Sequence, residues 1–247
     1  MDPRQPTGPA APAALRRAQV LVPTRDAPLQ GMLSLPEKAR GVVVFVHGSG
    51  STRFSPRNAH VAATFEAAGL GTLLFDLLSP AETEIDNRTL ALRFDIELLS
   101  RRLVEVLDWL DREGLAHLAQ APASSTASST AAEAVTTPRI GLFGASTGAA
   151  AALIAAAQRA DRVAAVVSRG GRPDLAGSWL PSVRAPTLLI VGGNDPQVIM
   201  LNRQAAESLR CPHELHIVPG ATHLFEEPGA LDEVARMARD WFLRLLG

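Results

Sequence analysis

The sequence predicts an α/β fold: a mainly parallel, twisted sheet with helices on both faces. Short apolar, β-prone runs alternate with helical segments along the chain, as in folds built from strand-helix-strand units. The runs 41–46 (GVVVFV) and 186–191 (PTLLIV) are apolar throughout, which is typical of strands buried on both faces of a sheet. Ligands are therefore expected at the carboxyl ends of the strands.

The elements are expected in the following order. A hairpin of residues 18–23 and 29–35 precedes the strand at 41–46. A helix then starts at Ser55, with Pro56 in its first position, and stops at Gly69. The later strands are expected at 71–75, 139–143, 163–168, 186–191 and 214–218, and the later helices at 94–113, 147–159, 198–209 and 231–246.

Length and low-complexity segments predict the domain organisation. One domain is expected over residues 16–247, because single α/β domains often reach this length. Residues 1–15 are rich in Pro and Ala and are expected to form a disordered tail. Residues 119–137 are low-complexity Ala/Ser/Thr and are expected to be a mobile surface insertion, with a linker between domains as the alternative.

Composition excludes several classes of protein. The 24 Lys+Arg and 25 Asp+Glu give a net charge of −1, so no broad basic field attracts nucleic acid. A single cysteine, Cys211, can form neither an intramolecular disulfide nor a multi-thiolate metal site. The longest apolar run, 149–157, is shorter than the roughly 18 residues of a membrane span. We expect a cytoplasmic protein without metal, cofactor, nucleic-acid or membrane partners; the oligomeric state stays open.

The strongest chemical signal is GASTG at 144–148, between an apolar strand and an Ala-rich helix. A serine at such a turn adopts a strained backbone conformation that exposes its hydroxyl, and the flanking glycines let strand and helix approach. Ser146 is thus the candidate nucleophile, and the N–H of Thr147 is directed at any oxyanion formed there. The alternative is a small-residue turn that merely begins a helix.

A serine nucleophile needs a base, and His223 lies in a turn-rich loop after the strand at 214–218. His60 and His117 fall on expected helices, where a solvated or packed imidazole is the simpler interpretation. The pair His213 and His216 lacks the H-E-x-x-H spacing of zinc sites.

The base in turn needs an acid to orient it. Asp195 occupies the loop after the strand at 186–191 and can fix the tautomer of the imidazole. A turn-forming Asn-Asp-Pro is the alternative interpretation of Asp195. Asp76, after the strand at 71–75, is the rival acid. The chain order Ser146, Asp195, His223 is that of the α/β-hydrolases.

The second oxyanion donor is expected in the loop after the strand at 41–46. The Ser49 amide is the first choice and Gly50 the second. The same loop invites a dinucleotide-binding interpretation, but the third glycine and a suitably spaced acid are missing. A phosphate-binding loop of the G-x-x-x-x-G-K-[ST] type does not occur in the sequence.

With these motifs in view, the chain resembles the α/β-hydrolase superfamily, and within it the dienelactone-hydrolase-like branch. The resemblance rests on HGSGSTRFSPRN, GASTG, GGNDPQV and GATHLFEEPG and runs from about residue 16 to the C-terminus, outside 119–137. It implies a serine hydrolase with Ser146 as nucleophile, Asp195 as acid and His223 as base. Dienelactone hydrolases proper use cysteine, so dienelactone itself is not the expected substrate. The segment 168–186 is too short for a large lid.

The sequence therefore predicts a carboxylic ester hydrolase that cleaves a small soluble ester, lactone or thioester through an acyl-enzyme. Substrate contacts are expected from Gly50 and from Arg53, Arg169 and Arg172, any of which could clamp an anionic group. Two alternatives stay open: a non-catalytic small-molecule-binding protein with the same fold, and a cofactor-free perhydrolase that uses the same triad.

Overall fold

The computed structural model describes residues 15–114 and 138–247. Its strands are β1 (Leu15–Val22), β2 (Leu29–Pro36), β3 (Val42–Val46), β4 (Gly71–Phe75), β5 (Ile140–Ala145), β6 (Val163–Arg169), β7 (Thr187–Gly192) and β8 (His213–Val218). The helices are α1 (Pro56–Ala67), α2 (Pro80–Thr89), α3 (Ile96–Trp109), α5 (Thr147–Gln158), α6 (Pro196–Ser208) and α7 (Ala230–Leu246). Shorter helical turns are η1 (Leu92–Phe94), η2 (Leu110–Gly114) and η3 (Pro173–Ser182).

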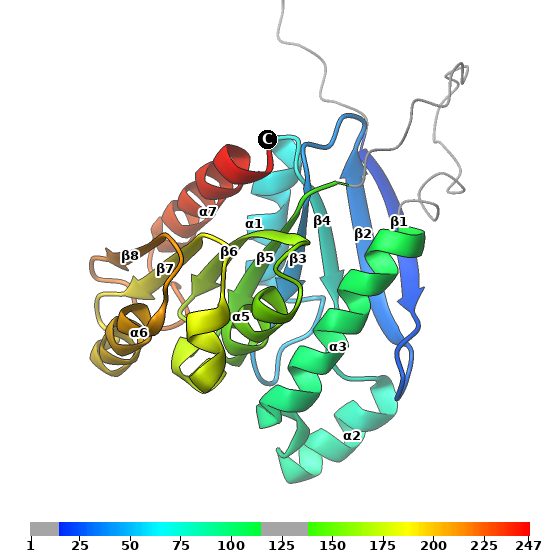
Figure 1. The fold of residues 1–247 in the computed structure, drawn as a ribbon, viewed down its shortest axis with the longest axis horizontal. Coiled ribbons are helices and arrows are strands. Elements are labelled where there is room, and N and C mark those ends of the chain that lie inside the picture. Colours follow the sequence, from blue (N-terminus) through cyan, green and yellow to red (C-terminus); the bar gives the residue numbers. More distant parts are fainter. Residues whose placement is uncertain (1–14, 115–137) are drawn as a thin grey trace, which may run out of the picture.

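The strands form one eight-stranded sheet in the order β1-β2-β4-β3-β5-β6-β7-β8 (Figure 1). β2 pairs antiparallel with both β1 and β4, and every pairing from β4 to β8 is parallel. The carboxyl ends of the parallel strands therefore meet at one edge, the lower edge in Figure 1. The loops that follow β3, β5, β7 and β8 all emerge at this edge, which is where ligands bind in open α/β sheets.

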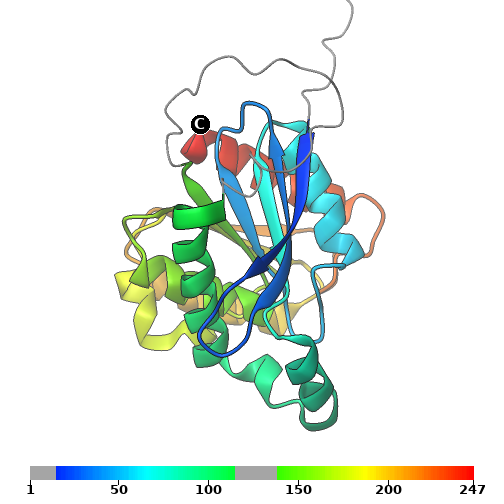
Figure 2. The ribbon, with the colours of Figure 1, turned by 90° about the vertical axis from the view of Figure 1, so that its right-hand side faces the viewer.

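Helices cover both faces of the sheet because successive strand residues point to opposite sides. Val42, Val44 and Val46 of β3 belong to a core cluster with α3 and α5. Val43 and Phe45 belong to a second cluster with α1 and α7. Figure 2 shows the two helical layers on either side of the sheet. The prediction of a mainly parallel sheet with helices on both faces is confirmed.

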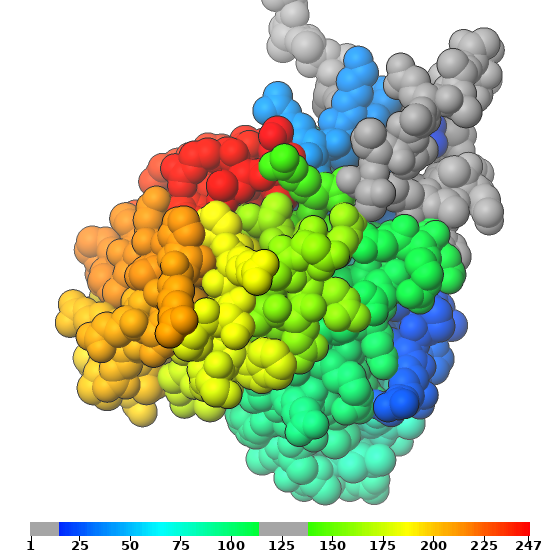
Figure 3. Space-filling view, in the orientation of Figure 1, coloured from blue at the N-terminus to red at the C-terminus, as the bar shows by residue number. Residues whose placement is uncertain are grey.

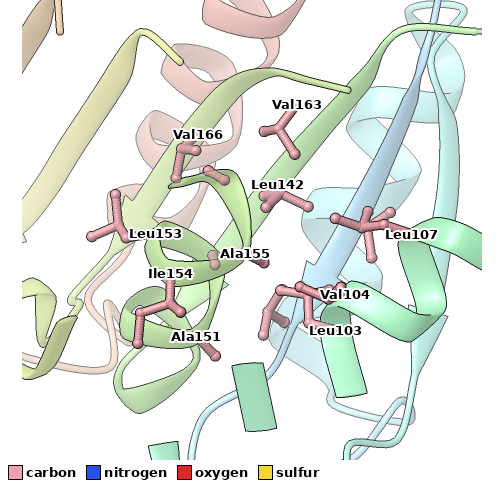
Figure 4. Packing of buried hydrophobic residues seen from close by; sticks show 14 of the residues in the cluster. Leu103, Val104, Leu107, Leu142, Ala151, Leu153, Ile154, Ala155, Val163 and Val166 are labelled. Carbon is pink, nitrogen blue, oxygen red and sulfur yellow. The ribbon is translucent and has the colours of Figure 1, made fainter. Parts of the chain in front are cut away.

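The core between α3, α5 and the sheet is built from branched side chains packed against alanines (Figure 4). Leu103 and Leu107 of α3 are fully buried, as are Ala151 and Ala155 of α5. Because alanine side chains are small, α5 can lie close to β5. Ser146 joins the end of β5 to the start of α5.

The expected strands are present, with a largest offset of three residues at the start of β1, expected at 18 and observed at Leu15. Ser55 caps α1 by accepting from the N–H of Asn58, with Pro56 in the first turn, as expected. The helix expected over 94–113 is divided: η1 comes first, α3 ends at Trp109 and the chain continues as the π-helical turn η2.

Two helical segments were not expected from the sequence, α2 and η3. Asp86 is the one buried residue of α2, so this helix has no apolar stripe for a periodicity argument to detect. The sequence signal for α2 is a capping box, in which Ser79 and Glu82 cap the first turn. Pro80 is also favourable in a first helical turn.

Some expectations lie outside the described residues, namely the low-complexity insertion at 119–137 and His117. The expected tail at 1–15 also lies outside them except for Leu15, which already belongs to β1. Within residues 15–114 and 138–247, no helix has the length and hydropathy that crossing a bilayer requires.

Leu103→Ala tests the packing in Figure 4. Because Leu103 is fully buried, truncation leaves a cavity between α3 and the sheet, and we expect a loss of about 2–5 kcal/mol in the free energy of unfolding, measured in urea. Leu21→Ala is the control, because Leu21 is 58% exposed, and it should change stability by about 0.5 kcal/mol or less. Equal losses in the two variants would contradict the assigned core.

Candidate active site

Ser146 stands at the sharp turn between β5 and α5, in a backbone conformation that few residues adopt. Its φ is 50° and its ψ is −123°, and positive φ costs a non-glycine residue free energy. Two glycines explain how the turn closes. A Cβ on Gly144 would lie 2.5 Å from Cα of Ala149, and one on Gly148 would lie 2.2 Å from the carbonyl oxygen of Val46. No other residue type fits either position without moving the backbone.

The loop after β6 braces this turn from both sides. The N–H of Ser146 donates to the carbonyl of Arg169 at 3.3 Å, and the carbonyl of Ser146 accepts from the N–H of Arg172 at 3.0 Å. Asn202 of α6, which is fully buried, donates to the carbonyl of Gly171 at 2.9 Å. The backbone that surrounds Ser146 is thus tied to β6 and α6 as well as to its own strand and helix.

Asp195 and His223 form a hydrogen-bonded pair. Nδ1 of His223 lies 2.8 Å from Oδ2 of Asp195, and because a carboxylate only accepts, Nδ1 carries the proton. The other oxygen of Asp195, Oδ1, accepts from the N–H of Val198 at the start of α6. Asp195 is mostly buried and held at both oxygens, whereas the imidazole is about two-fifths exposed. This arrangement leaves Nε2 of His223 free to act as an acceptor.

His223 lies against the loop that braces Ser146. A Cβ on Gly170 would lie 3.0 Å from the carbonyl oxygen of His223 and 3.6 Å from Cε1 of its ring, the atom next to Nε2. Gly170 directly follows Arg169, whose carbonyl binds the N–H of Ser146. The chain therefore brings the imidazole of His223 and the half-buried Ser146 to two consecutive residues, Arg169 and Gly170, at the end of β6.

The glycine-rich loop after β3 lies on the other side of Ser146. A Cβ on Gly48 would lie 2.9 Å from Cβ of Ser146, so only glycine permits this approach. The N–H of Ser49 donates to Oγ1 of Thr147 at 3.1 Å, and the Ser49 hydroxyl lies 3.2 Å from the same atom. The two residues expected to supply oxyanion donors are thus in contact, with the Ser49 amide directed at the Thr147 hydroxyl.

His47 fastens this loop to the end of β4. Its Nε2 accepts from the N–H of Leu77 at 3.0 Å, so the proton sits on Nδ1, which lies 3.0 Å from the carbonyl oxygen of Gly48. Burial lowers the pKa of His47 below its usual value, although the Gly48 carbonyl and the charge of Asp76 act in the opposite direction. The imidazole is therefore held neutral.

Asp76, the rival acid, is bound elsewhere. Its carboxylate accepts from the backbone N–H of Arg53 at 2.6 Å and from the Arg53 guanidinium. The other end of that guanidinium donates to Gln30 at 2.7 Å. Asp76 thus holds the loop after β3 in place.

Two of the expected substrate-binding arginines are paired with carboxylates of the chain itself. Arg53 is paired with Asp76 and Gln30, and the guanidinium of Arg172 is paired in bidentate fashion with Asp174 at 2.9 and 2.8 Å. An anionic substrate group would have to compete with these carboxylates for either guanidinium. Sequence alone could not identify these partners, because each pairing depends on the path of a loop.

Arg169 differs from them. It is 8% exposed, and its Nε and Nη1 are buried with no hydrogen-bond partner in the described part of the chain. Burial lowers its pKa to about 10, and the neighbouring charge of Arg57 acts in the same direction. Its side chain thus remains a cation at neutral pH.

A cavity of about 470 Å³ opens beside the glycine-rich loop, under α2. Gly50 and Ser49 line it, together with residues that the sequence had not singled out, among them Leu77, Thr83 and Arg93. The capping box at Ser79 was the one sequence signal that could have located this wall.

Comparison with known proteins decides the family. The family model described as "Dienelactone hydrolase family" matches residues 29–246. The chain belongs to the dienelactone hydrolase family. The crystal structure of a dienelactone hydrolase from Anabaena variabilis shares 50% identity with this family member, covers 94% of it and 99% of its own chain, and superposes with a TM-score of 0.84.

More distant structures share the fold alone. Est1E from Butyrivibrio proteoclasticus is 14% identical, covers 92% of this chain and 98% of its own, and has a TM-score of 0.70. The α/β-hydrolase fold expected from the motifs is thus confirmed, and no large lid is evident in the described residues.

A curated relative from Mycobacterium tuberculosis strain H37Rv is 51% identical over 234 residues. It carries the provisional name of a phosphoribosyl transferase. The match covers 95% of this chain but 48% of the relative, so the chain spans about half the length of the curated relatives it matches.

His47→Gln tests the loop anchor through its pH dependence. In the unfolded chain His47 has a pKa near 6.5 and takes up a proton as the pH falls below that value, whereas the native imidazole stays neutral to lower pH. Its contribution to stability is therefore complete above pH 6.5 and declines as the pH falls towards the lowered native pKa. We expect the urea midpoint of the unmodified protein to fall more between pH 7.5 and 5.5 than that of the variant. Equal falls in both proteins would contradict a neutral, structural His47.

Proposed function

We propose that this member of the dienelactone hydrolase family, a hydrolase family, is a serine esterase that acts through an acyl-enzyme. The observation that carries the proposal is the arrangement around Ser146. A strained serine, a histidine oriented by a buried carboxylate and a glycine-rich loop meet at the carboxyl edge of the sheet. The substrate class is a small ester, lactone or thioester.

In the proposed reaction, Oγ of Ser146 attacks the carbonyl carbon while Nε2 of His223 takes the hydroxyl proton. Nε2 is the ring nitrogen available for this step, because Nδ1 is bound to Asp195 at 2.8 Å. The tetrahedral intermediate collapses, and the alcohol or thiol leaves with the proton from His223. Water then attacks the acyl-enzyme with His223 again as base, which releases the acid and restores Ser146.

The oxyanion is proposed to bind the amides of Thr147 and Ser49. The N–H of Thr147 stands at the N-terminus of α5, where the first amides of a helix lack intrahelical partners. Since the Ser49 amide already donates to the Thr147 hydroxyl, an oxyanion bound there replaces one hydrogen bond with a stronger, charge-assisted one. Gly50 and Arg169 remain candidates for substrate contacts.

The transferase name of the mycobacterial relative is not carried over to this chain. That name describes a protein about twice as long, whereas the family match here spans nearly the whole chain. A cytoplasmic location and a small-molecule ester as the partner of this site are part of the proposal.

Ser146→Ala should lower kcat for 4-nitrophenyl acetate by roughly 10⁴–10⁶-fold, because it removes the nucleophile. Ser178→Ala is the matched control, since Ser178 is exposed on η3, and its kcat should equal that of the unmodified protein. Similar turnover in the Ser146 variant and the unmodified protein would show that the proposed mechanism is wrong.

A fluorophosphonate probe separates an enzyme from a non-catalytic binding protein of the same fold. Attack by Ser146 forms an O–P bond and expels fluoride, so intact mass should show one adduct that is absent in Ser146→Ala. A protein that binds small molecules without the reaction would give no adduct.

Asp195→Asn should lower kcat by about 10⁴-fold, the loss typical of this change in Ser-His-Asp enzymes. The amide keeps the shape of the side chain but no longer fixes the Nδ1–H tautomer of His223. Circular dichroism should be unchanged, which separates this effect from unfolding. A loss of less than about tenfold would exclude Asp195 as the orienting acid.

A further inference from the structure

The cavity under α2 has the size of a small-molecule site. Its volume of about 470 Å³ falls within the usual range of roughly 300–1,000 Å³. It lies between the loop after β3 and the segment from Leu77 through α2, and Leu99 of α3 also contributes. Figures 1 and 2 both place α2 beyond the lower ends of the strands, at the edge where Ser146 stands.

The cavity adjoins Ser146 through two residues of the glycine-rich loop. Gly48 lines the cavity, and a Cβ there would lie 2.9 Å from Cβ of Ser146. Ser49 also lines it and is hydrogen-bonded to Thr147. Ser146 and His223 themselves do not line it, so the cavity reaches the site through the glycine-rich loop that carries the proposed oxyanion donor Ser49.

This placement decides which part of an ester the cavity could hold. His223 must protonate the leaving alcohol, so the leaving group lies on the side of the imidazole. The acyl chain stays on Ser146 and extends past the oxyanion donors. The cavity next to Ser49 is therefore on the acyl side.

The ionised groups of the cavity are paired with one another or with neighbours. Asp86 is buried and binds Arg93 twice, from the backbone N–H at 2.9 Å and from Nε at 2.6 Å. Asp76 is paired with Arg53. Burial raises the pKa of Asp86, but the hydrogen bonds and charge of Arg93 outweigh it and lower the pKa, so the carboxylate stays ionised.

The Arg93 guanidinium keeps one nitrogen open towards the glycine-rich loop. Nη1 of Arg93 makes no hydrogen bond within the described part of the chain, and a Cβ on Gly50 would lie 3.0 Å from it. The absence of a side chain at Gly50 keeps this nitrogen uncovered. It can donate to an uncharged oxygen, while a carboxylate placed there would also meet Asp86 and Asp76.

The wall formed by α2 is fixed in advance. Arg102, fully buried in α3, donates to the carbonyl of Leu77 at 2.9 Å and forms a bidentate pair with Glu82 of α2. Burial alone would raise the pKa of Glu82, but the bonds from Arg102 and Ser79 lower it to about 2. The pair is therefore ionised at neutral pH and holds α2, which forms the bottom of the molecule in Figure 3.

We propose that this cavity is the acyl pocket and that it selects an uncharged acyl group, apolar along its length and tolerant of one acceptor oxygen near Arg93. The proposal rests on the proposed esterase activity of Ser146. It also replaces the expectation from sequence that arginines clamp an anionic substrate here. Leu77, Leu78 and Leu99 supply the apolar surface.

Two 4-nitrophenyl esters with six-carbon acyl groups test the charge preference: the hexanoate, which ends in a methyl group, and the adipate half-ester, which ends in a carboxylate. Each rate is normalised to the hydroxide-catalysed rate of the same ester. We expect kcat/KM to be at least about tenfold higher for the hexanoate, since a carboxylate would lose its hydration in a cavity whose arginine partners are already paired with Asp76 and Asp86. Asp86→Asn removes one of these charges and should raise the relative rate with adipate several-fold.

Two variants of α2 test the location. Thr83 lines the cavity, whereas Ile85 is exposed on the same helix and does not line it. Thr83→Trp should lower kcat/KM for hexanoate at least about tenfold relative to acetate by filling the cavity. Ile85→Trp adds a comparable indole and should leave that ratio unchanged.

The outcomes separate the two proposals. Activity that persists in Ser146→Ala overturns the proposed function. Ser146-dependent hydrolysis that favours adipate, or that accepts acetate but neither six-carbon ester, overturns the uncharged acyl pocket alone. An unchanged acyl-length ratio in Thr83→Trp shows that the acyl chain lies elsewhere.

Discussion

The close approach of three backbone segments at Ser146 is the constraint on which the site depends. β5, α5 and the loop after β3 meet there with no space for a Cβ at Gly48, Gly144 or Gly148. This crowding forces Ser146 to a φ of 50°, a conformation that costs free energy and persists only when the surroundings impose it. Hydrogen bonds from the Ser146 N–H to the Arg169 carbonyl and from the Arg172 N–H to the Ser146 carbonyl add a further constraint, so the backbone of the candidate nucleophile is held on several sides.

Some polar groups around this turn hold the fold together, and others are available for chemistry. His47 and Asp76 directly follow β3 and β4 at the carboxyl edge, where catalytic residues of this fold are also found. In the fold, they hold the loop after β3 through Leu77 and Arg53. The pair Asp195 and His223 lies on loops further along the sheet, with the imidazole exposed enough to meet a ligand. The position in the fold therefore distinguishes the two sets, not the residue type.

The sequence was sufficient for the sheet and for the edge at which Ser146, Asp195 and His223 lie, and insufficient for the walls of the site. Strands β3 and β7 are continuous apolar runs, and Ser146, Asp195 and His223 lie in the turns and loops after β5, β7 and β8, so the topology brings all three to one edge of the sheet. The helix α2 was not predicted because it buries Asp86 and has no apolar stripe. The pairing of Arg53 and Arg172 with carboxylates could not be read either, since it depends on loop paths that periodicity does not encode.

Arginine burial and arginine pairing have opposite consequences for a ligand site. Arg102 is fully buried but donates to Glu82 and to the carbonyl of Leu77, so its guanidinium holds α2 in place and is not directed at a ligand. Arg93 is bonded to Asp86 on one edge and open on the other, so it can orient a neutral oxygen without attracting an anion. Arg169 is buried with no carboxylate partner among residues 15–114 and 138–247, which is costly unless another group compensates for it. The side chain of Arg169 does not line the cavity, so whatever group compensates for its charge is separate from acyl recognition. An uncharged acyl pocket is therefore compatible with a buried cation elsewhere at the same edge of the sheet.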